Sequence, residues 1–285
     1  MEVRNGVWSA TWRSVVGMVV LQVGCQLVVA GQKVQVNQPC GSGDHPSVAE
    51  VEHSVYDRLL RKYVDDRGMV AYARWKASSS DIAELGGYLA KLGCVDLGKS
   101  APKAARLAYW INLYNALTLH GILREYPTSS IRKHTSTFGY NIWKDLLVTV
   151  DGRAYSLEDI EHKVLRKLGE PRIHLAIVCA SRGCPPLLNE AYSAAKLDEQ
   201  LNGRGREFFS RPENFRVDAS KRTVYFSQLF EWYGSDFAPT SSEQLKAFRA
   251  FLPDPGVLDW ATSEGVRYRY LSYDWSLNDQ QPIGK

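Results

Sequence analysis

The sequence has little cysteine and almost no excess of charge of either sign. Five cysteines in 285 residues are far too few for a fold in which disulfides replace a hydrophobic core. The formal net charge is +4, from 35 Lys and Arg against 31 Asp and Glu, without a long basic run. We therefore expect no nucleic-acid partner. With 45% hydrophobic and 23% charged residues, the composition is that of a globular protein, which excludes disordered, collagen-like and coiled-coil chains.

Several common catalytic and ligand-binding motifs are also missing. The chain has no glycine-rich phosphate loop, no G-x-S-x-G turn and no H-E-x-x-H helix. These absences exclude the common nucleotide-binding, serine-hydrolase and zinc-protease classes. A metal site made of His174, Cys179 and Cys184 is disfavoured, because four residues separate each ligand from the next and zinc sites are usually tighter. We expect neither a metal nor a cofactor.

The first thirty residues have the pattern of an export signal. Arg4 and Arg13 supply positive charge, and residues 14–30 are almost entirely apolar and end in small residues suited to signal peptidase. This run is short for a membrane span and contains two glutamines. We expect a periplasmic or secreted protein that loses residues 1–30 and keeps no stable membrane span. The alternative is a lipid anchor on Cys25.

Export changes the expected state of the cysteines. After cleavage four remain, namely Cys40, Cys94, Cys179 and Cys184. An even number in an oxidising compartment favours disulfides, and four cysteines allow three connectivities, which stay open. Cys179 and Cys184 are the closest in sequence and form a candidate pair. A redox-active disulfide is disfavoured there, because the usual spacing of two intervening residues is absent.

The pattern of helices and strands predicts a single α+β domain. Residues 31–47 are polar and rich in Gly and Pro, so we expect a flexible tether. Residues 48–285 then form the domain, with a strand extension at the C-terminal end. We expect a central mixed or antiparallel sheet packed against several helices.

Apolar spacing, caps and turn residues place the individual elements. Helices are predicted over 48–64, 81–93, 102–126 and 156–168, with another that begins at Ser241. Strands are predicted for a hairpin over 146–155, a buried strand over 173–179 and two later strands over 223–226 and 266–270.

Two asparagines lie on the apolar side of the helix predicted over 102–126. At about 100° per residue, Asn112 and Asn115 fall roughly opposite the charged side of this helix. Each unsatisfied buried polar group costs about 1–3 kcal/mol, so both amides need partners. Either they bind neighbouring backbone and fix the core, or they face a pocket and orient a substrate.

Four sequence blocks resemble a known family. They are YWINLYN at 109–115, SLEDIEHKVLR at 156–166, the stretch from Pro171 to Pro186 with its R-I-H, C-x-S and C-P-P parts, and F-x-W-Y-x-x-D-F at 230–237. In this order, over roughly 48–251, they resemble the domain-of-unknown-function 547 family. The resemblance implies no settled activity, and it is compatible with export because members occur as exported bacterial proteins as well as in larger eukaryotic proteins.

The first functional hypothesis, favoured by the sequence, is a binding or structural module with a polar pocket near Cys179. Its ligand would be an unidentified small molecule or peptide, and Cys179 and Cys184 would form a disulfide. Six aromatic residues are candidates for a sugar- or peptide-binding face, although their spacings suit core packing better: Trp232, Tyr233, Tyr268, Tyr270, Tyr273 and Trp275.

The second hypothesis is a thiol-dependent enzyme for acyl transfer or amide hydrolysis. Cys179 would be the nucleophile at the end of the predicted strand, with His162 as its base. Glu161 and Arg166 would bind the substrate, with Asn112 and Asn115 beside them. This hypothesis predicts that the asparagine helix, the Glu161/His162 helix and the Cys179 turn converge on one site.

The predicted strand sets His174 aside as the base. Five extended residues would place its Cα about 16 Å from that of Cys179, and alternation would direct the two side chains to opposite faces. His162 and His120, each on a helix, are therefore the better candidates.

Overall fold

A computed structural model describes residues 32–136 and 139–281. Helices and two small sheets combine in one domain, which confirms the predicted α+β class. The expected signal peptide, residues 1–30, and the alternative anchor Cys25 lie outside the described residues. Within the described ranges, no helix is long and apolar enough to cross a membrane.

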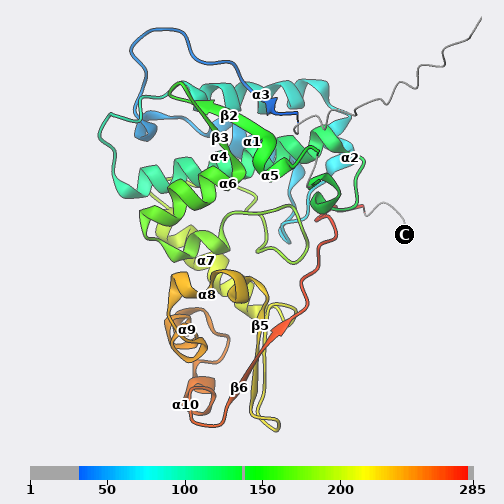
Figure 1. Ribbon diagram of the computed structural model, residues 1–285, viewed down its shortest axis with the longest axis vertical. Coiled ribbons are helices and arrows are strands. Elements are labelled where there is room, and N and C mark those ends of the chain that lie inside the picture. The colour runs from blue at the N-terminus through cyan, green and yellow to red at the C-terminus, as the bar shows by residue number, and fades with distance from the viewer. Residues whose placement is uncertain (1–31, 137–138, 282–285) are drawn as a thin grey trace, which may run out of the picture.

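The larger of two hydrophobic cores surrounds the long helix α4 (Lys103–Glu125) in the upper part of Figure 1. Pro102 precedes the helix and Pro127 follows its end, so both boundaries fall close to those predicted. Side chains on every side of α4 are buried because other elements enclose it. Other helices that contribute to this core are η1 (Val48–Glu50), α1 (Ser54–Tyr63), α2 (Tyr72–Lys76) and α3 (Ser79–Gly93).

A small mixed sheet packs against α3 and α4. Strands β2 (Leu146–Val150) and β3 (Arg153–Ser156) form the predicted antiparallel hairpin, and both residues of its Asp151-Gly152 turn have positive φ. Strand β1 (Val34–Gln35) pairs in parallel with β2.

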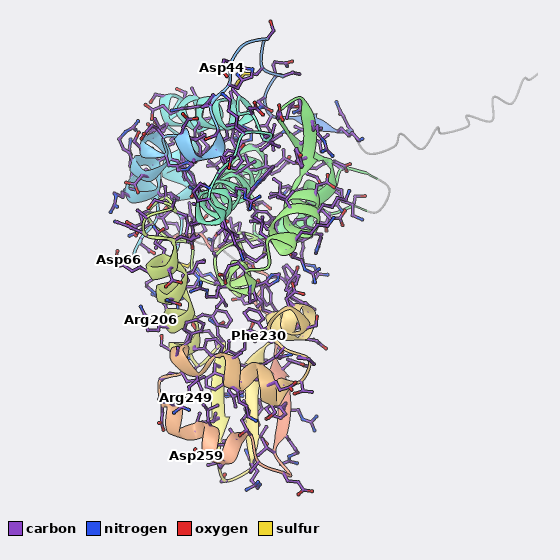
Figure 2. All side chains as sticks on the ribbon, turned by 90° about the vertical axis from the view of Figure 1, so that its left-hand side faces the viewer. Asp44, Asp66, Arg206, Phe230, Arg249 and Asp259 are labelled. Atoms are coloured by element: carbon purple, nitrogen blue, oxygen red, sulfur yellow. A yellow bond between two sulfur atoms is a disulfide. The ribbon has the colours of Figure 1, made fainter. Side chains whose placement is uncertain are left out.

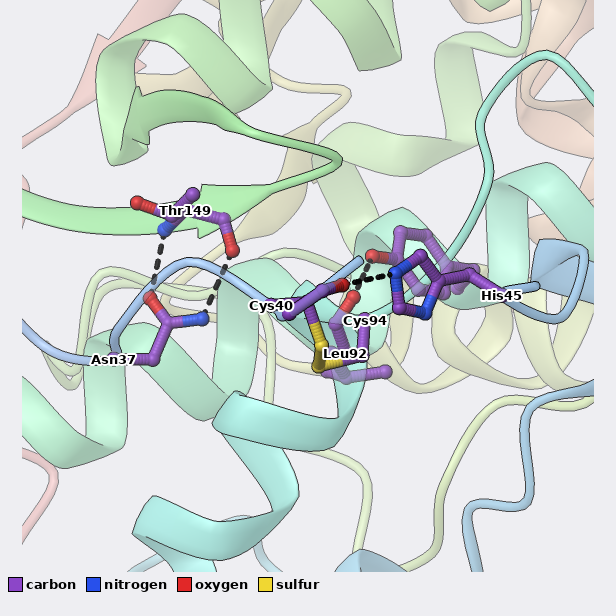
Figure 3. The surroundings of a disulfide bond; sticks show 8 residues. Asn37, Cys40, His45, Leu92, Cys94 and Thr149 are labelled. Carbon is purple, nitrogen blue, oxygen red and sulfur yellow. Dashed lines mark hydrogen bonds between the residues drawn. A yellow bond between two sulfur atoms is a disulfide. The ribbon is translucent and has the colours of Figure 1, made fainter. Parts of the chain in front are cut away.

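The segment expected to be a flexible tether, residues 31–47, is attached to this sheet along its described part (Figure 3). Besides the pairing of β1, the Asn37 amide accepts a hydrogen bond from the Thr149 backbone N–H (2.7 Å) and donates one to the Thr149 carbonyl (2.9 Å). A disulfide joins Cys40 to Cys94 beyond the end of α3. Composition indicates a loop here, but these contacts are with distant residues, so the loop is fixed rather than free.

A second, smaller core lies below the first in Figure 1 and is rich in phenylalanine. Helix α7 (Leu197–Ser210) joins the two, because Leu201 belongs to the larger core and Phe208 to the smaller. Figure 2 shows Phe230 within the smaller core, while Asp259 lies outside it on the surface. The remaining elements of this part are β4 (Phe215–Asp218), β5 (Thr223–Ser227), α8 (Leu229–Phe237), α9 (Ser241–Ala247), η6 (Arg249–Phe251), η7 (Pro255–Val257), α10 (Leu258–Ala261) and β6 (Arg267–Leu271).

The strands therefore divide between two sheets instead of forming the single central sheet expected. In the second sheet β5 lies in the middle, antiparallel to β4 and parallel to β6. Both sheets are therefore mixed, which agrees with the predicted type of sheet although not with the predicted number. They remain separate because each serves a different core: Val148 of β2 packs in the larger one and Phe226 of β5 in the smaller.

The buried strand predicted over 173–179 does not form. Pro171–Leu175 is instead a 3₁₀ helix, η5, and irregular backbone follows as far as Cys179. The run is apolar because it lies between the cores: Leu175 belongs to the smaller and Val178 to the larger. A short apolar run occurs both in central strands and in buried connections, so the sequence pattern does not distinguish the two.

His120, near the end of α4, is expected to make the free energy of unfolding depend on pH in mildly acidic solution. Its ring Nδ1 is buried without a hydrogen-bond partner, and burial, with Arg124 and Lys76 nearby, lowers its pKa to about 4. Because the pKa is depressed from 6.5, this contribution to stability is complete above pH 6.5 and is lost as the pH falls towards 4, by roughly 3 kcal/mol at most. We expect His120→Leu to lose less stability than the wild type between pH 7 and 4.5 in urea unfolding. Equal losses would contradict this assignment.

Candidate functional site

A pocket of about 320 Å³ is lined by residues of all four sequence blocks, of the segment around Trp143 and of the C-terminal segment. The lining includes Tyr114 of α4, Glu161 and His162 of the helical segment that begins at Leu157, and Cys179 and Cys184. The helix α5 (Ile142–Asp145), which follows the 3₁₀ turn η2 (Ile131–His134), and helix α8 supply further walls. The predicted convergence on one site thus holds for three chain segments, although not for every residue expected there.

The connection that leads to Cys179 is held by Asn115. The side-chain amide of Asn115 donates to the Ala176 carbonyl and accepts from the Val178 N–H, both at 3.0 Å. The chain then turns at Ala180, which has a φ of 58°, and returns to Cys184. This left-handed backbone conformation at Ala180 allows the chain to reverse its direction within a few residues.

Cys179 and Cys184, here called the thiol pair, lie in direct contact, with their Sγ atoms 2.7 Å apart. Both are free thiols in this structure, so the candidate disulfide between them is not closed here, and the disulfide among the described residues joins Cys40 to Cys94. The Sγ of Cys184 also accepts hydrogen bonds from the Cys179 backbone N–H and the Tyr273 hydroxyl, each at 3.0 Å.

These donors favour a thiolate on Cys184. Burial raises the pKa of Cys184, but hydrogen bonds from Cys179, Tyr273 and Ser181 outweigh burial and lower this pKa to about 6. The contact with Cys184, together with burial, raises the pKa of Cys179. The two sulfurs therefore titrate as one coupled pair, in which the thiolate is favoured on Cys184 and the proton on Cys179.

A distorted helix presents the acidic side of the pocket. Ser156 caps α6 (Leu157–Asp159), which continues as one π-helical turn, η3 (Ile160–Leu165), and a 3₁₀ turn, η4 (Arg166–Leu168), before Gly169 ends it. The π turn carries both predicted residues, with Glu161 buried and His162 exposed. Such turns occur frequently at functional sites. The Glu161 carboxylate accepts a hydrogen bond from the Tyr114 hydroxyl at 3.1 Å.

Asp236 of α8 is hydrogen-bonded to both Arg166 and His174 beside the pocket. The Arg166 guanidinium donates to both carboxylate oxygens (2.7 and 2.6 Å), and the His174 Nε2 lies 2.8 Å from Oδ2. Arg166, followed by His174, lowers the pKa of Asp236 to about 2. Burial lowers the pKa of His174 despite the neighbouring carboxylate, and its ring stacks on Tyr233 at 4.3 Å.

The predicted site residues therefore separate into two groups. Cys179, Cys184, Glu161 and His162 line the pocket together. Arg166 does not line it and is bound by Asp236 instead.

Asn112 and Asn115 do not line the pocket either, so they are not placed to bind a substrate as expected. Asn112 donates to the Tyr192 carbonyl (2.8 Å) and accepts from the Tyr192 N–H (2.9 Å), as Asn115 does for the Cys179 connection. The first of the two alternatives, backbone binding, is the one observed.

Sequence reasoning set His174 aside, yet it lines the pocket with Cys179 because the strand that would have separated them is absent. His120, the other candidate base, does not line it. Tyr114 was also missed, although it lies within the YWINLYN block. Of the six aromatic candidates, four line the pocket, namely Trp232, Tyr233, Tyr273 and Trp275, whereas Tyr268 and Tyr270 lie on β6. Across the described ranges, no cluster of three or more His, Cys, Asp or Glu side chains suits a metal ion.

Comparison with known families supplies one match, to the model described as "Protein of unknown function, DUF547". Residues 99–209 match DUF547. The resemblance expected from the sequence blocks is therefore confirmed over this segment. No curated protein and no solved structure matches the chain.

The DUF547 segment contains most of the chemistry of the pocket. Tyr114, Glu161, His174 and the thiol pair all fall within residues 99–209. The fourth block, at 230–237, lies beyond the match and supplies Asp236 and part of the aromatic wall. The pocket is thus built mainly by the DUF547 segment and completed by the residues that follow it.

Proposed function

We propose that the protein catalyses thiol–disulfide exchange with a small substrate bound in the pocket. The observation that carries this proposal is the contact of the two sulfurs at 2.7 Å in the wall of the pocket. A disulfide between them is compatible with the local chain, since the turn at Ala180 already brings both cysteines together. The two-residue spacing that usually achieves this is therefore not required.

The first half-reaction uses both thiols and balances with the substrate disulfide alone, and turnover then requires a second substrate, a small-molecule thiol, that reduces the thiol pair again. The Cys184 thiolate attacks one sulfur of a substrate disulfide, forms a mixed disulfide and displaces the other half of the substrate as a thiolate. Cys179 then gives up its proton, attacks Cys184 and displaces the second half. The substrate gains two electrons and becomes two thiols, while the thiol pair is oxidised to a disulfide. The reverse reaction oxidises thiols.

The hydrogen bonds to Cys184 favour exchange over the alternatives. A thiol with a pKa of about 6 is mostly ionised at neutral pH, and the thiolate is the reactive form. Acyl transfer does not require a second thiol, and a second thiol in contact with the nucleophile would promote oxidation of the nucleophile to a disulfide. A binding or structural module needs the pocket but not a stabilised thiolate. Exchange also suits the oxidising compartment that the export prediction implies.

The test is a count of thiols after reaction with 2-hydroxyethyl disulfide. The protein is first reduced mildly, with peptide mass mapping to check that Cys40–Cys94 stays intact, and is then mixed with the disulfide at pH 7. We expect two equivalents of 2-mercaptoethanol per protein and a Cys179–Cys184 disulfide in the peptide map. A thiol pair that reacts no faster than an exposed cysteine, or that stops at one equivalent with a stable adduct, would overturn the proposal.

A further inference from the structure

We propose that the pocket binds a cationic group of its substrate, a protonated amine or a guanidinium, between Glu161 and a cluster of aromatic rings. The inference rests on the proposed function in taking this pocket as the place where the substrate binds. It adds the chemical class of that substrate, namely a small disulfide or thiol that carries positive charge.

Glu161 is a buried carboxylate without a basic partner among the described residues. Only 7% of the residue is exposed, and the carboxylate accepts a hydrogen bond from the Tyr114 hydroxyl. Burial and the Glu161 carboxylate raise the pKa of Tyr233, so this second phenol is also close. Phenols donate hydrogen bonds but carry no positive charge. Arg166 and His174 are close enough to interact with the Glu161 charge, but Asp236 binds both, so a cation in direct contact would add an ion pair to this buried carboxylate.

Three basic side chains in the pocket or on the helix of Glu161 are paired with other carboxylates. They form the pairs Lys144–Glu158 (3.6 Å), Lys163–Asp159 (2.5 Å) and Arg166–Asp236 (2.6 Å). Counting Lys, Arg, Asp and Glu alone, the charged lining residues are one Lys and two Glu, which sum to −1. The Cys184 thiolate makes the pocket more negative, so it attracts a cation and disfavours an anion.

An aromatic cluster provides the other half of the proposed site. The Tyr273 and Trp275 ring centroids are 4.6 Å apart, and Trp232 lies 5.0 Å from Tyr273 and 5.6 Å from Trp275. Trp232 is 41% exposed, which is unusual for so large an apolar side chain. The faces of such rings attract cations, and Trp275 already has the Arg132 guanidinium 5.2 Å from its centroid.

Chemistry and size then define the substrate more closely. Tyr273 both belongs to this cluster and donates to the Cys184 sulfur, so a cation against these rings lies near the thiol pair. A pocket of about 320 Å³ suits a small molecule or a single side chain. An amine a few bonds away from a disulfide, as in an aminothiol disulfide, meets both requirements.

The experiment compares three disulfides of similar length and different charge: cystamine, 2-hydroxyethyl disulfide and 3,3′-dithiodipropionate. Each rate constant is divided by that of the same disulfide with free 2-mercaptoethanol, which removes intrinsic reactivity. We expect the wild type to prefer cystamine over the neutral disulfide by about tenfold, as for one partly desolvated charge interaction. Glu161→Gln should remove this preference. Glu199→Gln, an equal charge change on the exposed side of α7, should keep it.

Binding without reaction separates this inference from the proposed function. In the doubly substituted protein Cys179→Ser/Cys184→Ser, putrescine is titrated while tryptophan fluorescence and heat are recorded. If putrescine binds and Glu161→Gln abolishes binding while the wild type exchanges none of the disulfides, the cation site stands and the exchange function fails. If exchange proceeds at equal normalised rates for all three disulfides and putrescine does not bind, the cation site fails and exchange stands.

Discussion

Replacing Cys184 with serine is expected to lower the rate constant for reaction with 2-hydroxyethyl disulfide at pH 7 by at least about 100-fold. The wild-type pair has a thiol with a pKa of about 6, which is mainly thiolate at this pH. After the substitution only Cys179 remains in the pocket, and its buried thiol has a raised pKa. The rate is measured by mass spectrometry of the quenched protein.

Cys179→Ser is the matched control, because the introduced hydroxyl still donates a hydrogen bond to the Cys184 sulfur. Attack by Cys184 should persist, but no second thiol remains to resolve the mixed disulfide. The protein should therefore accumulate as a stable adduct on Cys184. The opposite result, with attack lost in Cys179→Ser and kept in Cys184→Ser, would make Cys179 the nucleophile, as in the second hypothesis from the sequence.

The pH dependence of alkylation tests the same assignment in the unmodified protein. Iodoacetamide reacts with the thiolate, so the rate at Cys184 should rise with pH, reach half its maximum near pH 6 and level off above pH 7. Peptide mapping assigns the modified residue. A rate that still increases tenfold per pH unit at pH 8 would mean an ordinary thiol and would remove the basis for exchange.

The parts of the fold that the sequence predicts correctly are those that local signals decide. Prolines delimit α4, and the Asp151-Gly152 turn between two short β-forming runs defines the β2–β3 hairpin. The attachment of residues 31–47 was not predictable in this way, because it depends on the Asn37–Thr149 contacts and the Cys40–Cys94 disulfide across long stretches of chain.

The sequence predicts where the site lies in the chain, but it does not predict what each residue does there. Glu161, His162 and Cys179 line one pocket. This location was predictable because each is a polar residue on an element that also carries apolar residues for the core. His174 was rejected on strand geometry that the chain does not adopt, and Arg166 was assigned to substrate although Asp236 binds it. Both errors concern tertiary structure, since the local backbone decides where His174 points and a distant carboxylate decides what Arg166 binds, and spacing along the chain carries little information about either.

Asn115→Leu should destabilise the protein by about 4 kcal/mol and also abolish the unusual reactivity of the thiol pair. Leucine is similar in volume but leaves the Ala176 carbonyl and the Val178 N–H unsatisfied, at about 1–3 kcal/mol for each group. Urea unfolding gives the free energy, and iodoacetamide alkylation at pH 7 gives the reactivity. Asn115→Asp keeps the acceptor for Val178 and serves as a milder variant if the leucine protein does not fold.

Asn112→Leu provides the control, since Asn112 binds the Tyr192 carbonyl and N–H with the same geometry three residues earlier on α4. Both variants should lose similar free energy of unfolding, because each orphans one buried carbonyl and one buried N–H. Only the substitution at Asn115 frees the connection that positions Cys179 against Cys184, so only there should alkylation slow and its midpoint shift above pH 6. Equal effects of the two variants on the thiols would mean that general loosening of the larger core, rather than the Asn115 clamp, controls the contact between the sulfurs.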